Sequence, residues 1–414
     1  MKFNWPLNDN NFSFWDRLKI CSFFLKKNNR WTQDKYVKIY EQTWSNYCNY
    51  VFVVMVSSGS TANTLIAQYS RDKLNNGKNI IVFPSITWQT SVSPWIREGF
   101  EPKFIDISLK DLSIDTKKLE IYLKENHEKV HTVFVTSLLG FTPNIPELRR
   151  LCSKYNVYFK LDNCENAFGH YRESQGFPLQ HVCSDVTSSM SLYFGHHLTT
   201  GSEGGLILTN NYDEYVYYLL ARSHGMVRNL DKFGILGSTY DKLRNNKVDE
   251  KFDFALLGNN FRSNDIAAYM ALLNFNKKDQ NIESRLDNFN IFKENLNLNK
   301  FYLPSNRLNT LDVPFCLPII LNPKYKLFKN QETCKKIMVN IKKYLDEKSI
   351  EYRPIISGNL LRQTCYEKYD NFKKFKVSEH LSKNGLYVGL HQNVSKSKIK
   401  KLVSNLNYIV DFYV

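Results

Sequence analysis

Residues 157–166 read Val-Tyr-Phe-Lys-Leu-Asp-Asn-Cys-Glu-Asn, a β-rich run that ends in a group of polar side chains. This short apolar run predicts a strand over residues 157–162, whose last residue is Asp162. Ligands bind outside the carboxyl ends of the strands in open α/β sheets, and a buried acid there needs a partner that carries a proton or a charge. A ligand with a protonated pyridine nitrogen would supply that partner; capping of a following helix is the alternative for Asp162.

Similar runs recur on both sides of this strand between about residue 50 and residue 270. The expected strands cover residues 51–56, 80–84, 102–107, 131–136, 157–162, 186–192 and 204–209. Helices are expected between them, at residues 61–74, 116–126 and 145–155. Alternation of strand and helix predicts an α/β protein with a mainly parallel, doubly wound sheet of these seven strands.

The pattern changes after about residue 275 to long polar helices with a few strands, for example at 313–321 and 386–389. We therefore expect an N-terminal arm with one helix over residues 1–45. A large domain is expected over residues 46–275 and a smaller α+β domain over residues 276–414. The arm is expected to pack on one of these domains or on a partner chain.

The composition is that of an ordinary globular protein. Of the 414 residues, 43% are hydrophobic and 23% charged, which argues against disorder. The sequence contains neither an apolar run of about 18 residues, as a membrane span needs, nor a secretory signal, so we expect a cytoplasmic protein without a membrane partner. The eight cysteines form no CxxC or CxC pair, which indicates neither a zinc site nor an iron–sulfur cluster.

The net charge of +16 arises from 56 Lys and Arg residues against 40 Asp and Glu residues. The basic residues are scattered along the chain instead of lying on one helix face, so we do not expect nucleic acid as a partner. A basic surface favours anionic substrates, including nucleotide diphosphates, because it attracts and concentrates them.

Two further stretches contain candidate ligand-binding residues. Residues 56–63, Val-Ser-Ser-Gly-Ser-Thr-Ala-Asn, open a predicted helix, where glycine and free N–H groups can accommodate a phosphate. An ordinary N-cap explains the same pattern equally well. Residues 188–205 contain His196 and His197 next to each other among Gly, Ser and Thr residues, which indicates a functional site and not a buried core. A metal site is not expected, because adjacent side chains on a strand or loop point apart and no carboxylate pattern accompanies them.

These three stretches, in this order, make the chain resemble the sugar aminotransferase and dehydratase family of pyridoxal-phosphate (PLP) enzymes. The resemblance implies the type I, aspartate aminotransferase fold. It also implies a turn that holds the cofactor phosphate, an aromatic residue stacked on the pyridine ring and an acid on the ring nitrogen. A further residue, commonly Gln, lies beside the ring, and a serine donates to the phosphate. In this sequence Gly59 and Ser60 match the turn, Trp88 the aromatic residue and Asp162 the acid on the ring nitrogen. Glu165 matches the residue beside the ring, and Ser191 matches the serine.

One position departs from the family pattern. Five residues after Ser191, where the family has its cofactor-binding lysine, this chain has His196, and no lysine occurs between Lys160 and Lys232. Without that amine, PLP or its pyridoxamine form (PMP) is expected to bind non-covalently, and sustained transamination is not expected. The replacement resembles a subgroup of sugar 3-dehydratases. His196 is then expected to move the proton during removal of the C3 hydroxyl.

Within this subgroup the resemblance implies one of two kinds of enzyme. One acts on CDP-sugars and needs an iron–sulfur centre with a CxC pair, which this chain lacks. The other acts on GDP-4-keto-6-deoxy-D-mannose and takes its amine from L-glutamate. We expect the second kind, in the biosynthesis of 3,6-dideoxyhexoses for surface glycans such as lipopolysaccharide O-antigen. The alternatives are a CDP-sugar 3-dehydratase, a PLP-dependent sugar aminotransferase and a non-catalytic protein that has lost its lysine.

The resemblance also implies roles for residues outside the three stretches. His224 is expected to be catalytic by positioning glutamate or the sugar. Asn260 and Arg262 match a loop that reaches the active site of the other subunit, with Asn260 on the cofactor and Arg262 on the substrate, which implies a homodimer with shared active sites. Arg353 and His391 are expected to face the carboxylate or diphosphate of the substrate, and an arginine fork suits both anions.

Overall fold

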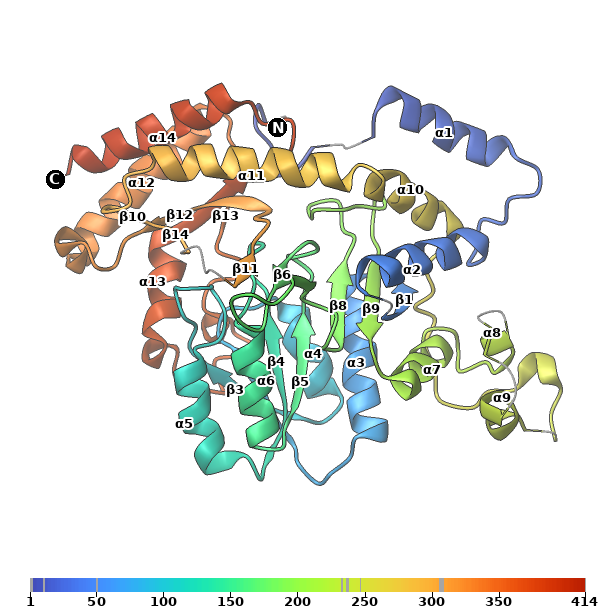
Figure 1. Cartoon of the computed structure of the whole chain (residues 1–414). Coiled ribbons are helices and arrows are strands. Elements are labelled where there is room, and N and C mark those ends of the chain that lie inside the picture. Colours follow the sequence, from blue (N-terminus) through green and yellow to red (C-terminus); the bar gives the residue numbers. More distant parts are fainter. Residues whose placement is uncertain are drawn as a thin grey trace.

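The computed structural model describes residues 3–9, 12–49, 51–231, 234–235, 238–245, 247–304 and 309–413. Its centre is a seven-stranded sheet with the order β1-β9-β8-β5-β4-β2-β3 (Figure 1). The strands are β1 (Phe52–Val56), β2 (Ile80–Pro84), β3 (Glu101–Ile105), β4 (Val130–Thr136), β5 (Tyr158–Asp162), β8 (Ser188–Ser191) and β9 (Gly205–Thr209). Strand β9 is antiparallel to its neighbours β1 and β8, and the other adjacent pairs are parallel. Each strand overlaps one predicted range, so the mainly parallel seven-stranded sheet is confirmed.

Helices cover both faces of this sheet, and strands such as β1 and β2 accordingly consist of mostly buried apolar residues. They are α2 (Lys35–Tyr47), α3 (Gly59–Lys73), α4 (Gln89–Arg97), α5 (Thr116–Asn126), α6 (Ile145–Lys154), α7 (Tyr212–Ala221) and α10 (Asp265–Phe275). Side chains alternate between the two faces along a strand. In β1, Val53 and Met55 belong to the core on the face that α2, α5, α6 and α10 cover, whereas Val54 and Val56 belong to the core on the face of α3, α4 and α7. The three predicted helices correspond to α3, α5 and α6.

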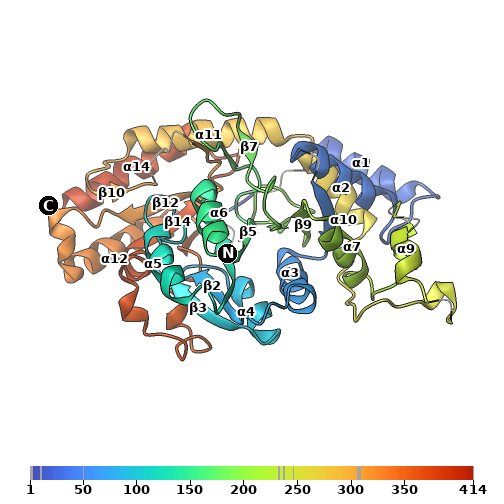
Figure 2. The same ribbon diagram turned by 60° about the horizontal axis from the view of Figure 1, so that its bottom comes forward.

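A second layer follows in the C-terminal part, where a four-stranded antiparallel sheet has the order β10-β12-β14-β13 (Figure 2). Its strands are β10 (Phe301–Tyr302), β12 (Cys316–Leu321), β13 (Tyr352–Pro354) and β14 (Gly385–Gly389). The accompanying helices are α11 (Lys278–Asn295), α12 (Gln331–Glu347), α13 (Lys376–Asn384) and α14 (Lys396–Asp411). Their core is continuous with Leu138 and Phe141, which follow β4. The domain boundaries expected from the sequence stay predictions.

The remaining elements are short. They are β6 (His170–Tyr171), β7 (Gln180–His181), β11 (Thr310–Leu311), α8 (Arg228–Asp231) and α9 (Ser238–Leu243), with single 3-10 turns at Glu250–Phe252, Lys326–Lys329, Leu360–Arg362 and Phe372–Lys374. Among the described helices, none combines the length and the apolar character that crossing a membrane requires.

The N-terminal arm contains two helices, α1 (Phe14–Leu25) and α2, so the prediction of one helix is wrong. Helix α1 starts at a capping box in which Ser13 and Asp16 bond reciprocally. Phe23 is buried, but most of the other large apolar residues are exposed, for example Leu25 at 84%, so no continuous buried apolar stripe marks this helix in the sequence. Helix α1 lies at the opposite end of the molecule from α12 and α14 (Figures 1 and 2).

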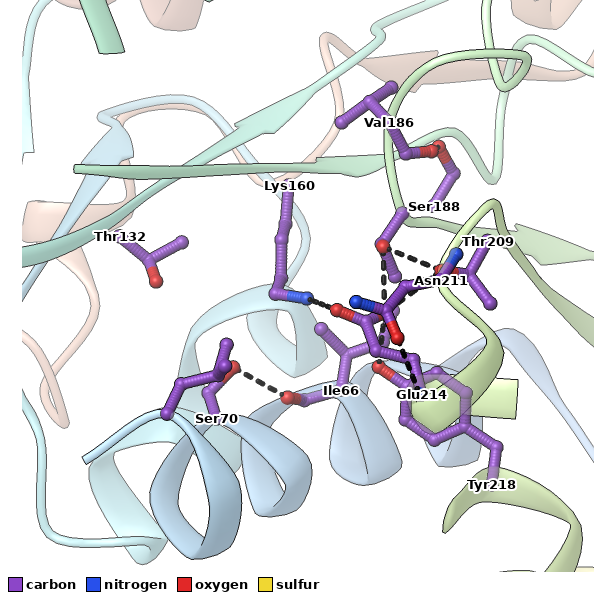
Figure 3. Close-up of polar contacts among 12 residues, drawn as sticks. Ile66, Ser70, Thr132, Lys160, Val186, Ser188, Thr209, Asn211, Glu214 and Tyr218 are labelled. Atoms are coloured by element: carbon purple, nitrogen blue, oxygen red, sulfur yellow. Dashed lines mark hydrogen bonds and ion pairs between the residues drawn. The ribbon is translucent and has the colours of Figure 1, made fainter. Parts of the chain in front are cut away.

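A buried ion pair joins the central strand β5 to α7. Lys160 Nζ lies 2.7 Å from Glu214 Oε1, and both side chains are less than a tenth exposed. The other oxygen of Glu214 accepts hydroxyl hydrogen bonds from Thr187 at 2.7 Å and from Thr209 and Tyr218 at 3.1 Å (Figure 3). Burial raises the pKa of Glu214, but the charge of Lys160 and the hydrogen bonds outweigh it and hold that pKa below its ordinary value.

Loss of Lys160 should destabilise the protein strongly, because Glu214 would remain as an uncompensated buried charge. We expect Lys160→Met to lower the free energy of unfolding by about 3–5 kcal/mol, measured by urea-induced unfolding. The matched control is Lys154→Met, which removes an exposed pair with Glu120 at 2.9 Å and should have a much smaller effect. Equal effects of the two substitutions would contradict the structural importance of the buried pair.

Candidate active site

The carboxylate of Asp162 is buried at the carboxyl end of β5, with 2% of the residue exposed. One oxygen accepts hydrogen bonds from Asn63 Nδ2 on α3 at 2.8 Å and from Ser91 Oγ on α4 at 2.6 Å. The other oxygen accepts the backbone N–H of Cys164 at 3.1 Å. These donors replace water around a buried charge. They therefore fix the orientation of the carboxylate at the sheet edge where ligands of α/β proteins bind.

Helix α3 begins beside this carboxylate. Ser58 caps it, since Ser58 Oγ accepts the N–H of Thr61 at 3.1 Å and Thr61 bonds back to the N–H of Ser58. The first N–H groups of a helix have no acceptor within it and are available to an anion. At the first position, Gly59, a Cβ would lie 2.7 Å from the sulfur of Cys164 and 2.9 Å from the Cβ of Ser191. Glycine therefore allows all three sequence stretches to meet at one point.

His196 lies in the turn that follows β8. Its ring packs edge-on against Tyr193 and Phe315, with centroid separations of 5.8 and 6.0 Å. Its Nδ1 is buried and has no hydrogen-bond partner in the described part of the chain. Burial lowers the pKa of His196 to about 4, and the negative charge of Asp162 opposes this shift. The imidazole is therefore neutral at pH 7.

His197 has a different environment. It is fully buried, and its Nε2 donates to the carbonyl oxygen of Val313 at 2.7 Å. Its ring packs edge-on against Phe168 and Phe315. Burial lowers the pKa of His197 well below its ordinary value. These contacts favour a structural role for His197, which holds the turn of His196 against the segment that leads into β12.

Glu165 is partly buried in the loop after β5, where its Oε2 accepts the backbone N–H of Leu139 at 2.9 Å. Burial raises the pKa of Glu165 to about 8; the bond from Leu139 opposes this shift and the charge of Asp162 adds to it. Glu165 is therefore protonated at pH 7 and can donate a hydrogen bond. A protonated carboxyl offers the same donor and acceptor as the glutamine amide that the resembled family commonly has here.

The remaining residues predicted to bind the cofactor lie at the same end of the sheet. Ser60 Oγ is 2.7 Å from Thr90 Oγ1, which joins the first turns of α3 and α4. Trp88 is the N-cap residue of α4 and is 57% exposed, three residues before Ser91. The structure thus gathers the following predicted residues: Gly59, Ser60, Trp88, Asp162, Glu165, Ser191 and His196.

A second group of predicted residues lies beside the start of α3 on two segments, with His224 after α7 and Asn260 and Arg262 on the loop before α10. Arg262 Nη2 is 3.3 Å from Nε2 of His224, and Arg262 Nε donates to Asn260 Oδ1 at 3.1 Å. The carbonyl of Phe261 accepts the N–H of Ser57 at 2.9 Å, which attaches the loop to the end of β1. His224 has a φ of 63°, a left-handed backbone conformation that is uncommon outside glycine. The assigned roles of these residues stay predictions.

The last two predicted residues belong to the C-terminal layer. Arg353 is an exposed residue of β13 whose Nη2 forms an ion pair with Glu351 Oε1 at 2.8 Å. His391 follows β14 and is 4% exposed. Burial lowers the pKa of His391 to about 4, and the charge of Arg285 acts in the same direction. Contact of either residue with a substrate stays a prediction.

Sequence reasoning missed Asn63 and Ser91, which hold Asp162. Both are buried, with 1% and 0% of the residue exposed. A weak signal existed, because Asn63 is a polar residue that lies one helical turn after Gly59 and one turn before the apolar Ile66 and Ala67. Their partner lies 99 and 71 residues further along the chain, so only the folded structure identifies it.

The chemistry of these groups fits pyridoxal phosphate. Asp162 offers a negative charge for a protonated ring nitrogen, and the first turn of α3 offers N–H groups and the Ser60 hydroxyl for a phosphate. The protonated Glu165 can donate to a ring oxygen, and His196 has a buried nitrogen without a partner in the described residues. No group of three or more His, Cys, Asp or Glu side chains in the described ranges is placed to hold a metal ion.

The chain is similar to known proteins over nearly its whole length. A model of the DegT/DnrJ/EryC1/StrS aminotransferase family matches residues 24–407. GDP-4-keto-6-deoxy-D-mannose 3-dehydratase of Escherichia coli O55:H7 is 30% identical over 405 residues, which cover 94% of this chain and 96% of that protein.

Solved structures extend this similarity to the fold. E. coli GDP-4-keto-6-deoxy-D-mannose-3-dehydratase with bound hydrated PLP has a TM-score of 0.82 at 26% sequence identity and covers 98% of this chain and 100% of its own. GDP-4-keto-6-deoxymannose-3-dehydratase with a trapped PLP-glutamate geminal diamine has a TM-score of 0.80 at 25% identity and covers 97% and 100%, respectively. The PLP-dependent aminotransferase fold expected from the sequence is confirmed.

The contacts of Asp162 predict how the site binds PLP. In Asp162→Asn the negative charge opposite the ring nitrogen is lost, and a hydrogen bond to a charged group contributes about 1.5–3 kcal/mol. We expect the affinity for PLP to fall by about tenfold to a hundredfold, measured by fluorescence titration. Asp185→Asn is the control, because Asp185 bonds Arg149 and Tyr171 elsewhere. Unchanged affinity in Asp162→Asn would rule out this pairing.

Proposed function

The chain belongs to the DegT/DnrJ/EryC1/StrS aminotransferase family, and on this premise we propose that it is a PLP-dependent nucleotide-sugar 3-dehydratase. The substrate proposed is GDP-4-keto-6-deoxy-D-mannose, and L-glutamate is the proposed amine donor. The main observation is the histidine in the lysine position: His196 lies in the turn that follows Ser191, and its partly buried imidazole is under the influence of the Asp162 charge. The cytoplasmic location expected from the sequence is part of the same proposal.

When bound, the cofactor in its amine form supplies the nitrogen that condenses with the C4 ketone of the sugar and an acceptor for electrons. Asp162 holds a proton on the ring nitrogen, and its three donors keep its carboxylate in place. Gly59, Ser60 and Ser191 would hold the phosphate, and Trp88 would stack on the ring. The site residues therefore orient the reacting atoms before any proton moves.

His196 moves the proton. Because its pKa is about 4, the neutral imidazole is the resting form, and it accepts a proton from the C4′ carbon of the cofactor. The imidazolium is then a strong acid and donates this proton to the C3 hydroxyl oxygen as that group leaves the sugar. An imidazole cannot bind the cofactor covalently as a lysine amine does. Hydrolysis therefore releases the nitrogen as ammonia, and the product is a 3-deoxy-4-keto sugar.

The names of the relatives support the choice of substrates. The relatives are named for GDP-4-keto-6-deoxymannose, and one solved relative carries a PLP-glutamate geminal diamine. In this chain the guanidinium groups of Arg262 and Arg353 are exposed and suit a diphosphate or a carboxylate. The net charge of +16 attracts such anions.

A homodimer with shared active sites belongs to the same proposal. Trp15 and Leu25 on α1 are 70% and 84% exposed, and Leu257, three residues before Asn260, is 99% exposed. Groups of exposed large apolar side chains mark protein–protein interfaces. We infer that a second copy covers them and that Asn260 and Arg262 reach the cofactor and substrate of that copy.

The product identifies the reaction. Protein incubated with PLP, L-glutamate and GDP-4-keto-6-deoxymannose should yield a sugar that lacks the C3 oxygen, together with 2-oxoglutarate, read by mass spectrometry. His196→Lys should abolish this deoxygenation and hold PLP covalently, seen as added protein mass after borohydride reduction. An amino sugar from the natural protein, or an unchanged 3-deoxy product from the variant, would contradict the proposed role of His196.

The two shifted pKa values predict the pH dependence. Activity requires neutral His196 and protonated Glu165, so kcat/KM should rise as the pH increases through about 4 and fall as it increases through about 8. Glu165→Gln keeps a hydrogen-bond donor that does not titrate, and the decline near pH 8 should disappear. If that decline persists in the variant, Glu165 is not the group responsible for it.

A further inference from the structure

The turn that carries His196 is bonded by a residue almost 190 positions earlier in the chain. Asn8 is only 6% exposed, and its Nδ2 donates to the carbonyl oxygens of Phe194 and of His196, the latter at 3.4 Å. Among the described residues, no backbone N–H donates to either carbonyl. A buried polar side chain that satisfies two loop carbonyls restricts the movement of that loop.

The segment that precedes Asn8 is bonded to the C-terminal layer. Trp5 is 3% exposed, its Nε1 donates to the carbonyl of Gly389 at 3.0 Å, and its own carbonyl accepts the N–H of Glu351 at 2.8 Å. The N–H of Leu7 donates to Glu351 Oε2 at 3.0 Å. A Cβ on Gly389 would lie 2.4 Å from the carbonyl oxygens of Pro6 and Leu7, so this segment runs directly against β14.

Residues 5–8, which we call the N-terminal strap, therefore connect two parts of the candidate active site. At one end Asn8 bonds the turn of His196. At the other end Glu351, which accepts the N–H of Leu7, also forms the ion pair with Arg353 at 2.8 Å. The strap thus spans from the strand of a proposed substrate-binding residue to the turn of the proposed proton carrier.

We propose that Asn8 is a positioning residue of the reaction, which acts by fixing the turn that carries His196. This inference rests on the proposed function, since it assumes that His196 moves the proton. Proton transfer requires heavy atoms within about 2.6–3.2 Å, and a displacement of about 1 Å can reduce a rate by about a hundredfold. Asn8 does not touch the reacting atoms; its effect passes through the backbone of residues 194–196.

The test compares Asn8→Leu, which keeps the approximate size and removes both donors, with Asp9→Ala. Asp9 is the matched control, because it lies on the same segment but accepts from Asn393 Nδ2 at 3.0 Å. We expect Asn8→Leu to slow the single-turnover reaction of bound PLP with L-glutamate by about tenfold to a hundredfold, while the affinity for PLP is unchanged. Hydrogen exchange of the amides of residues 192–197 should become faster in this variant alone.

The inference is overturned if Asn8→Leu reacts as fast as Asp9→Ala, or if faster exchange extends through the sheet, which would show a general structural role. Should Asn8→Leu not fold, Asn8→Ser, which is smaller and loses one donor, replaces it and faces the same two criteria. The glutamate reaction does not involve the sugar, so a wrong nucleotide sugar leaves the test intact. If the natural protein does not react with glutamate, the proposed function fails, and the exchange data still decide whether Asn8 fixes the turn.

Discussion

A carboxylate buried at the edge of the central sheet is the constraint on which the rest of the site depends. Asp162 ends β5, and a charge at 2% exposure is stable only when donors replace its water. Asn63 on α3 and Ser91 on α4 supply these donors, and their bonds to Asp162 hold both helices at the same end of the sheet. Gly59 then allows α3 to approach Cys164 and Ser191 closely. The hydrogen bonds that stabilise the buried Asp162 carboxylate therefore also place the start of α3, which can hold a phosphate, beside it.

The same buried surroundings set the protonation states of the site residues. Burial moves the pKa of Glu165 up to about 8 and that of His196 down to about 4, so both groups are neutral at pH 7 around the carboxylate of Asp162. Environments that separate pKa values in this way allow neighbouring groups to take different parts in acid–base chemistry. Glu165 is left as a hydrogen-bond donor and His196 as a proton acceptor. The negative charge of Asp162 remains available for a positively charged ring nitrogen.

Much of the fold and of the candidate site could be predicted from the sequence, because most strands are short apolar runs and the candidate ligand-binding residues follow them directly. Gly59, Asp162, Ser191 and His196 are local signals of this kind. The second helix of the N-terminal arm could not be predicted, since most apolar side chains of α1, with the exception of Phe23, are exposed and form no buried stripe. The role of Asn8 depends on a contact across 186 residues, and its sequence neighbourhood carries no trace of that partner. Sequence patterns therefore predict which residues surround the site, whereas the contacts that orient them require the fold.

We propose that the histidine in the lysine position causes the amine nitrogen to leave as ammonia instead of remaining on the sugar. This nitrogen can be followed from [15N]L-glutamate through a complete reaction with the nucleotide sugar. The label should appear as free ammonium in an amount equal to the 3-deoxy-4-keto sugar formed, and the sugar should contain none. Label retained in the sugar would rule out this role of His196 and indicate an aminotransferase.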